Sequence, residues 1–216
     1  MTTPVAEGFF DFACPRSFLA FNRLNEAVMR TQSELEWRPV SKAEFLSVCV
    51  EDEPQLSERR ANYAAKDLKN WASYCGVVLA RDPADTPDSR AALKGAFLAI
   101  EHGLAKPYLK AVYEACWTEQ RDIADIGILA DIAASAGLEK QEFLEWLDKP
   151  PVEDALTRNA HELNERGGFR LPTQFVGDDM YVGSARMPLL ELALGQASDI
   201  EFVLPGAHDS FVDENY

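Results

Sequence analysis

The sequence predicts one α/β domain that is interrupted by a long insertion made of helices. Strand-like alternation of apolar residues occurs close to the amino terminus and again late in the chain. Between these two parts, roughly a hundred residues show helical spacing and helix-ending glycines and prolines, with no convincing strand. Neither strand-forming part has enough strands to close a core alone, so we expect both parts to share one sheet.

The first predicted unit is a strand, a helix and a second strand. Residues 9–12 alternate as in a buried strand, and apolar residues then recur at helical spacing from Ala20 onward. Leu35 and Trp37 alternate with charged residues before Pro39, which indicates the second strand. Two strands joined through a helix favour a parallel pair.

The middle of the chain is predicted to be helical because capping residues and prolines open its segments and glycines or prolines end them. Helices are expected at residues 58–75, 86–104, 106–118, 122–136, 139–148 and 152–166.

The character of the sequence changes back after this helical part. Residues 173–176 and 180–183 are short strand-like runs joined by the turn Gly177-Asp178-Asp179, which is typical of a hairpin. A last helix is expected over residues 187–194. The predicted organisation is a discontinuous α/β domain of residues 1–50 and 152–196, a helical insertion of residues 51–151, and a C-terminal tail of residues 197–216.

Composition restricts the partners of the protein. The 36 acidic and 21 basic side chains leave a net charge of -15, which repels nucleic-acid phosphates and anionic membrane surfaces. The first residues lack a basic region followed by an apolar stretch, and nowhere do about eighteen apolar residues run uninterrupted. We therefore expect a cytoplasmic protein that acts on a small molecule, without a nucleic-acid or membrane partner.

The cysteines and histidines predict no metal site. The four cysteines are far apart and form no C-x-x-C pair, so they indicate neither a zinc site nor a disulfide framework. The three histidines have no cysteine or carboxylate at ligand spacing. Cys75 and Cys116 share helix faces with apolar residues and are expected to be small core residues.

Cys14 differs from the other cysteines because it stands where the first strand meets the first helix. Pro15 follows it directly, and proline is well tolerated in the first helical turn. Unpaired N–H groups and the positive end of the helix dipole favour a thiolate at this position. We therefore expect an acidified, catalytic Cys14.

Two motifs on either side of the helical part resemble DsbA-like proteins of the thioredoxin fold. Residues 10–17 read FDFACPRS, while residues 171–175 read LPTQF and are followed by GSAR at residues 183–186. Similar motifs occur in the 2-hydroxychromene-2-carboxylate isomerases and the kappa-class glutathione transferases. This resemblance implies a thioredoxin-like fold with an all-helical insertion, a glutathione-dependent isomerase or transferase activity, and a possible homodimer.

The resemblance also assigns roles to individual residues. Cys14 stands in place of a catalytic serine that stabilises the thiolate of bound glutathione. Leu171 and a cis Pro172 would position the cysteinyl part of glutathione, and Ser184 would hold its γ-glutamyl carboxylate. In the isomerases, the glutathione thiolate adds to an unsaturated aromatic pyruvate, which allows the former double bond to rotate before elimination. We expect Arg16 to contact the substrate.

Two departures from the family pattern leave alternatives open. Ala185 replaces an aspartate that would pair with the γ-glutamyl ammonium, which weakens the expected binding of glutathione. Cys14 can either stabilise the glutathione thiolate or act as a nucleophile. Ser17 is predicted to take part in catalysis, and it occupies the position of the second cysteine of DsbA-type proteins. The alternatives are a monothiol disulfide oxidoreductase and an inactive thioredoxin-fold binding module.

Overall fold

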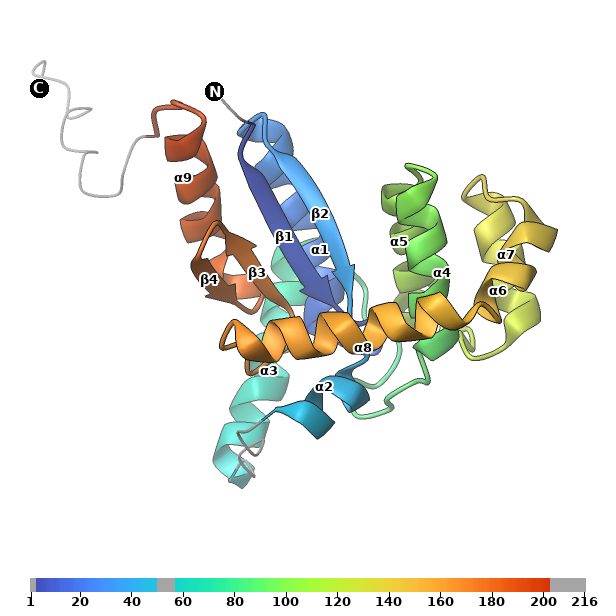
Figure 1. Cartoon of the computed structure of the whole chain (residues 1–216). Helices are drawn as coiled ribbons and strands as arrows, with labels where there is room; N and C mark the ends of the chain where they lie inside the picture. The colour runs from blue at the N-terminus through green and yellow to red at the C-terminus, as the bar shows by residue number, and fades with distance from the viewer. Residues whose placement is uncertain (1–2, 50–56, 203–216) are drawn as a thin grey trace, which may run out of the picture.

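The structure, a computed structural model, describes residues 3–49 and 57–202 and contains a four-stranded sheet (Figure 1). The strand order is β2-β1-β3-β4, with β1 parallel to β2 and antiparallel to β3, and β3 antiparallel to β4. The strands are β1 (Val5–Phe10), β2 (Glu34–Pro39), β3 (Thr173–Val176) and β4 (Asp179–Val182). The predicted parallel pair, the late hairpin and the sheet shared by both ends of the chain are all confirmed.

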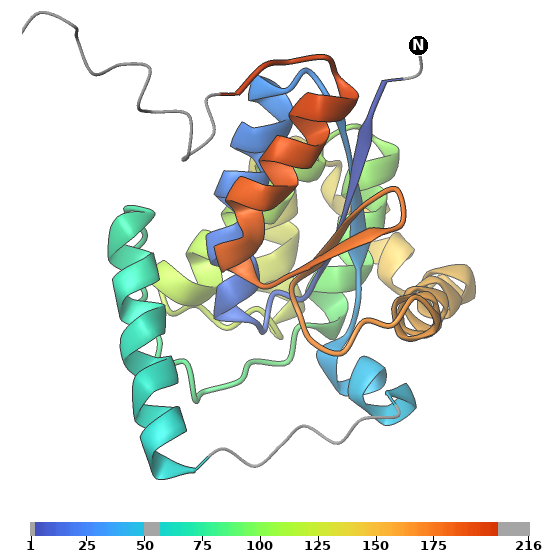
Figure 2. The same cartoon turned by 90° about the vertical axis from the view of Figure 1, so that its left-hand side faces the viewer.

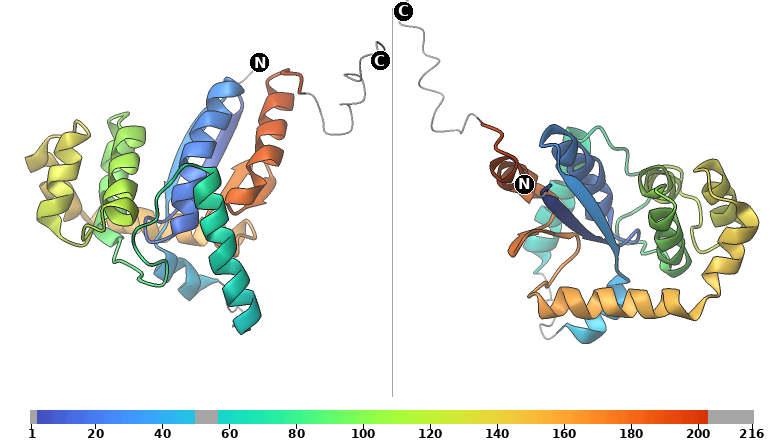
Figure 3. Two further views of the ribbon diagram at one scale, coloured as in Figure 1. Left: turned by 180° about the vertical axis from the view of Figure 1, so that it is seen from behind. Right: turned by 45° about the horizontal axis from the view of Figure 1, so that its top comes forward.

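Helices cover both faces of this sheet. On one face, α1 (Pro15–Arg30) and α9 (Met187–Ala197) lie side by side (Figure 2). On the other face, α8 (Pro150–Glu165) runs across the strands beside the short helix α2 (Lys42–Val48) (Figure 3). Gly8 allows α1 to approach closely, because a Cβ atom at this position would lie 3.0 Å from a methyl carbon of Leu24.

The helices between α2 and α8 form the predicted insertion. They are α3 (Glu58–Tyr74), α4 (Arg90–Glu101), α5 (Ala105–Tyr113), a π-helical turn η1 (Glu114–Thr118), α6 (Ile126–Ser135) and α7 (Lys140–Leu147). Helices α4 to α7 pack beside the sheet, whereas α3 stands apart on the side of α1 (Figures 2 and 3).

One apolar core joins the insertion to the sheet. The main buried cluster contains Phe10 and Phe12 next to Tyr108, Tyr113 and Trp117 of the insertion. The two parts of the chain therefore share a continuous interior, in which Cys116 is buried as predicted while Cys75 is half-buried. The predicted domain boundaries stay predictions. Two ranges lie outside the described residues, 50–56 and 203–216, and the second includes most of the expected tail.

Three helices differ from the prediction, and each difference has a local cause. Helix α4 begins at Arg90 instead of residue 86, because the Ser89 hydroxyl bonds to Asp11. Helix α6 begins at Ile126, where the side chain of Asp125 accepts from the amide of the third residue of the helix. Helix α2 is not predicted from the sequence, because its seven residues are too few to establish a helical period.

The described residues also bear on the predicted absence of a membrane segment. Within residues 3–49 and 57–202, no helix combines the length and the hydropathy needed to cross a bilayer.

Candidate active site at the start of α1

The fold brings Cys14 to the loop that contains Leu171 and Pro172. Cys14 is the N-cap residue of α1, directly after β1, and Pro15 opens the helix. Its thiol donates to the carbonyl oxygen of Leu171 across a distance of 3.6 Å, although 157 residues separate the two in sequence. The Leu171–Pro172 peptide bond is cis, as the resemblance implied. Three of the expected site residues therefore meet at the carboxyl end of β1.

The predicted acidification of Cys14 is wrong, because burial raises the pKa of its thiol above the ordinary value. The hydroxyl and amide of Ser17 oppose this rise, while the negative charge of Asp11 adds to it. Loss of water around the sulfur outweighs the favourable amides at the start of the helix. The hydrogen bond to the Leu171 carbonyl exists only while the thiol keeps its proton. Burial therefore favours the neutral thiol form of Cys14.

Alkylation by iodoacetamide tests this protonation state. Because only the thiolate reacts, we expect alkylation of Cys14 to be slow at pH 7. We expect the alkylation rate to keep rising with pH above 9.0, which is the ordinary pKa of a cysteine thiol. Mass spectrometry of the Cys14 peptide after timed labelling measures the rate, and the same peptide in denaturant is the control. A midpoint below that of the denatured chain would contradict the neutral thiol.

Ser17 lies on the first turn of α1, behind Cys14. Its amide donates to the Cys14 carbonyl at 3.0 Å, which is part of the helix start. Its hydroxyl is buried and has no hydrogen-bond partner in the described part of the chain. The structure thus places Ser17 beside the thiol, and its predicted catalytic role stays a prediction.

Arg16 is engaged by helix α3. Its guanidinium forms an ion pair with Asp67 at 3.0 Å and donates to the carbonyl oxygen of Ala64 at 3.3 Å. The charge of Arg16 is therefore matched by α3, and the pair connects α3 to the start of α1. Contact between Arg16 and a substrate stays a prediction.

Ser184 begins a short 3-10 helix, η2 (Ser184–Arg186), which leads into α9. Its hydroxyl is buried, with 2% of the residue exposed, and it has no partner among residues 3–49 and 57–202. Arg23 donates to the Ser184 carbonyl at 2.6 Å and stacks over the ring of Trp71 at 4.9 Å. Contact between Ser184 and glutathione stays a prediction.

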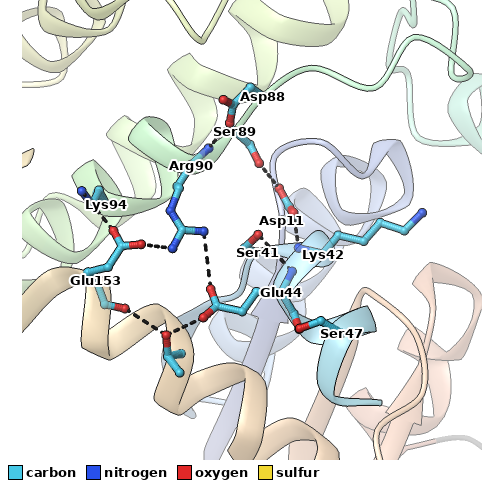
Figure 4. Close-up of polar contacts among 11 residues, drawn as sticks. Asp11, Ser41, Lys42, Glu44, Ser47, Asp88, Ser89, Arg90, Lys94 and Glu153 are labelled. Atoms are coloured by element: carbon cyan, nitrogen blue, oxygen red, sulfur yellow. Dashed lines mark hydrogen bonds and ion pairs between the residues drawn. The ribbon is translucent and has the colours of Figure 1, made fainter. Parts of the chain in front are cut away.

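Asp11 lies next to the site, and the sequence did not predict a role for it. It is 2% exposed, and it accepts a hydrogen bond from the amide of Ala13 at 2.8 Å. It also accepts from the amide of Lys42 at 2.6 Å and from the hydroxyl of Ser89 at 2.5 Å (Figure 4). Burial raises the pKa of this carboxyl, against the effect of its three donors. A single acidic residue among aromatic residues was the available signal, because such a residue needs several donors when buried.

A second polar cluster next to Asp11 connects α2, α4 and α8 (Figure 4). Arg90 lies 3.5 Å from Glu44 and also pairs with Glu153, which accepts from Lys94 at 3.1 Å. A cavity of about 450 Å³ lies beside this cluster, and its lining includes Ala13, the neighbour of Cys14. A larger hollow of about 650 Å³ lies along β2, away from the predicted site residues.

Comparison with known proteins supports the fold and the family. The chain matches the model of the DSBA-like thioredoxin domain over residues 6–195. It is 26% identical to a 2-hydroxychromene-2-carboxylate isomerase of Pseudomonas putida, over 89% of this chain and 95% of the relative. A solved structure of a 2-hydroxychromene-2-carboxylate isomerase superposes with a TM-score of 0.77 at 24% identity, covering 89% of this chain and 95% of that chain.

A third similar protein is a cytosolic disulfide reductase, DsbM of Pseudomonas aeruginosa, solved with GSH. It has a TM-score of 0.62 at 19% identity and covers 90% of this chain and 94% of its own. These likenesses confirm the expected thioredoxin-like fold with its helical insertion. The chain belongs to the family of DSBA-like thioredoxin-domain proteins.

Proposed function

We propose that the protein is a glutathione-dependent isomerase of the 2-hydroxychromene-2-carboxylate type, in which Cys14 acts as a neutral hydrogen-bond donor. The supporting observation is the Cys14 thiol, whose pKa burial raises and which donates to the Leu171 carbonyl. A protonated thiol is a poor nucleophile, since the thiolate is the reactive form. Toward a negatively charged sulfur, however, it is a suitable donor, as a serine hydroxyl would be.

Glutathione is the proposed thiol cofactor, and when bound it supplies the thiolate that adds to the unsaturated substrate. In this proposal the Cys14 thiol donates to the glutathione sulfur, and the Ser184 hydroxyl donates to the γ-glutamyl carboxylate. The backbone of Leu171 and the ring of Pro172 orient the cysteinyl part. Ala185 makes no bond to the ammonium, so the affinity for glutathione depends on the other contacts. The presence of GSH in the DsbM structure supports the choice of cofactor.

The cavity beside Ala13 is the proposed substrate pocket. Its volume of about 450 Å³ suits a small molecule, because ligand pockets commonly measure about 300–1,000 Å³. Leu46 of α2 and Pro87, before α4, contribute apolar surface to its lining. An aromatic acid of the kind used by the isomerase relatives is therefore the proposed substrate class.

Turnover measurements test this function directly. We expect the protein to interconvert 2-hydroxychromene-2-carboxylate and its open-chain pyruvate isomer only when millimolar glutathione is present. We also expect it not to reduce insulin or glutathione mixed disulfides above the uncatalysed rate. Absorbance spectroscopy follows the first reaction, and thiol release follows the second.

The two alternatives correspond to other outcomes of the same measurements. Disulfide reduction without isomerisation would identify a monothiol oxidoreductase, in which Cys14 attacks as a thiolate and an external thiol replaces the second cysteine. Neither activity would identify a binding module. A homodimer, suggested by the resemblance, and a cytoplasmic location, suggested by the first residues and the lack of a long apolar run, remain part of the proposal.

A further inference from the structure

Helix α1 carries three arginines along one side, and the middle one has a different environment from the other two. Successive arginines are seven residues apart, which is about two helical turns. Arg16 pairs with Asp67 of α3 at 3.0 Å, and Arg30 pairs with Glu191 of α9 at 2.9 Å. Within residues 3–49 and 57–202, Arg23 forms no ion pair with a carboxylate.

Arg23 is held instead by a backbone carbonyl and two aromatic rings. Its guanidinium donates to the carbonyl oxygen of Ser184 at 2.6 Å. The same group lies 4.9 Å from the ring centroid of Trp71 and 5.8 Å from that of Tyr74, in the last turn of α3, which lies beside α1 (Figure 2). The face of an aromatic ring attracts a cation without neutralising its charge. Arg23 is therefore fixed in place with its charge unmatched.

The nearest carboxylates are engaged elsewhere. Arg23 lines a cavity of about 490 Å³ between α1, the end of α3 and the start of α9. The carboxylates of Glu26 and Glu191 line the same cavity, and both pair with Arg30, at 3.5 Å and 2.9 Å. Ala185, in the turn before α9, brings no carboxylate to this region. A ligand in the cavity therefore meets an uncompensated positive charge.

The turn at Ser184 is fixed through its backbone on both sides of the residue. Arg23 holds the carbonyl of Ser184, while the amide of Gly183 donates to the carbonyl of Pro172 at 2.8 Å. The Ser184 hydroxyl is buried and has no hydrogen-bond partner in the described part of the chain. Buried polar groups are nearly always paired in folded proteins, so an unpaired hydroxyl in a fixed turn requires an explanation.

We propose that Arg23 determines specificity for the γ-glutamyl end of glutathione, an inference that rests on the proposed function. Its charge attracts the γ-glutamyl carboxylate to the turn, and its bond to the Ser184 carbonyl positions the Ser184 hydroxyl to donate to that carboxylate. Trp71 supports the guanidinium from the side of α3. The first helix of the insertion thereby takes part in the choice of the thiol cofactor.

Calorimetric titration of the free protein with two thiols tests this proposal. The thiols are glutathione and its glycyl monoethyl ester, which keeps the γ-glutamyl carboxylate but lacks the glycyl one. We expect Arg23→Met to weaken the binding of both about tenfold, because the charge acts at the γ-glutamyl end. Arg23→Lys retains a charge and a donor, so its affinity should lie within about threefold of the wild type.

Arg30→Met is the matched control. Arg30 belongs to the same side of α1 and lines the same cavity, but it pairs with Glu191 and makes no described bond to Ser184. We expect wild-type affinity for glutathione in this variant. Trp71→Leu should weaken binding about threefold alone and add nothing to Arg23→Met, since Trp71 acts through Arg23.

Each outcome of the titrations has a definite meaning. Equal affinity of the wild type and Arg23→Met for glutathione, or an equal loss in Arg30→Met, would overturn the inference and leave the proposed function intact. A loss that the ester does not share would also overturn it, because the charge would then bind the glycyl carboxylate. A wild type that binds no glutathione at millimolar concentration would reject the proposed cofactor and this inference together.

Melting temperatures show whether each variant is folded at the temperature of the titration. If Arg23→Met does not fold, Arg23→Gln replaces it, because glutamine keeps a donor for the Ser184 carbonyl but has no charge. We expect Arg23→Gln to bind both thiols more weakly than Arg23→Lys does. The reverse order would overturn the role of the charge.

Discussion

Replacing Cys14 with alanine should lower the rate of glutathione-dependent isomerisation by roughly 10- to 150-fold, whereas serine should restore most of it. A hydrogen bond to a charged group contributes about 1.5–3 kcal/mol, and each 1.36 kcal/mol corresponds to about tenfold in rate. Serine keeps a donor at the same position, while alanine has none. Steady-state kinetics at saturating glutathione, with kcat and KM determined separately, measure the effect.

The two variants distinguish a donor from a nucleophile at this position. If Cys14→Ser were as slow as Cys14→Ala, the sulfur itself would have to attack the substrate, because a serine hydroxyl has far too high a pKa to replace a thiolate. Equal urea midpoints for the wild type and both variants would show that the comparison reports on chemistry. The side chain of Cys14 makes one described hydrogen bond, to the Leu171 carbonyl, so we expect little change in stability.

The second large effect is expected at Asp11, and it concerns stability. Asp11→Ala leaves the amides of Ala13 and Lys42 and the hydroxyl of Ser89 without their acceptor. Unsatisfied buried donors cost about 1–3 kcal/mol each, part of which is offset because the buried carboxylate is also removed. We therefore expect the free energy of unfolding to fall by about 3 kcal/mol, measured by urea denaturation with tryptophan fluorescence.

Asp88→Ala is the matched control for this prediction. Asp88 belongs to the same cluster and accepts from the amide of Arg90 at 3.0 Å, but its side chain is exposed (Figure 4). Water can satisfy the freed amide, so the loss should stay below about 1 kcal/mol. A loss for Asp11→Ala as small as that of Asp88→Ala would contradict the role assigned to the Asp11 carboxylate.

The pH dependence of the Asp11 effect has a definite sign. Because burial raises the pKa of Asp11, the folded chain binds this proton at a higher pH than the unfolded chain, whose value is near 3.8. The contribution of Asp11 to stability therefore increases as the pH falls through the folded-state value toward 3.8. The stability difference between the wild type and Asp11→Asn should grow over that interval, and a difference that shrinks would contradict the raised pKa.

Patterns that depend on near neighbours were read correctly from the sequence. The strand before Cys14, the proline that opens α1, the parallel partner strand and the late hairpin all follow from alternation, helical spacing and turn residues. These signals are local, because one face of each element must be apolar wherever the element packs. The two resembling motifs added the cis peptide bond at Pro172, which no pattern in the residues predicts.

The start of α4 shows where local reasoning fails. Thr86 and Pro87 form a good helix opening by themselves, yet the helix begins only at Arg90. The hydroxyl of Ser89 donates a hydrogen bond to the carboxyl of Asp11, which lies 78 residues earlier in the chain. A bond to a buried carboxylate outweighs the small preference of a capping pair.

Order along the chain was therefore sufficient to predict an α/β domain with a helical insertion and a cysteine at the junction of a strand and a helix. The protonation of that cysteine was decided by the tertiary structure, which reversed the local expectation. A helix start favours a thiolate through a few neighbouring amides, but burial outweighs them, and the apolar cluster against which Cys14 packs includes residues of α2, α8 and the Leu171–Pro172 loop, all distant in sequence. Desolvation depends on all the residues that pack around an atom, so the desolvation of the Cys14 thiol cannot be predicted from one stretch of sequence.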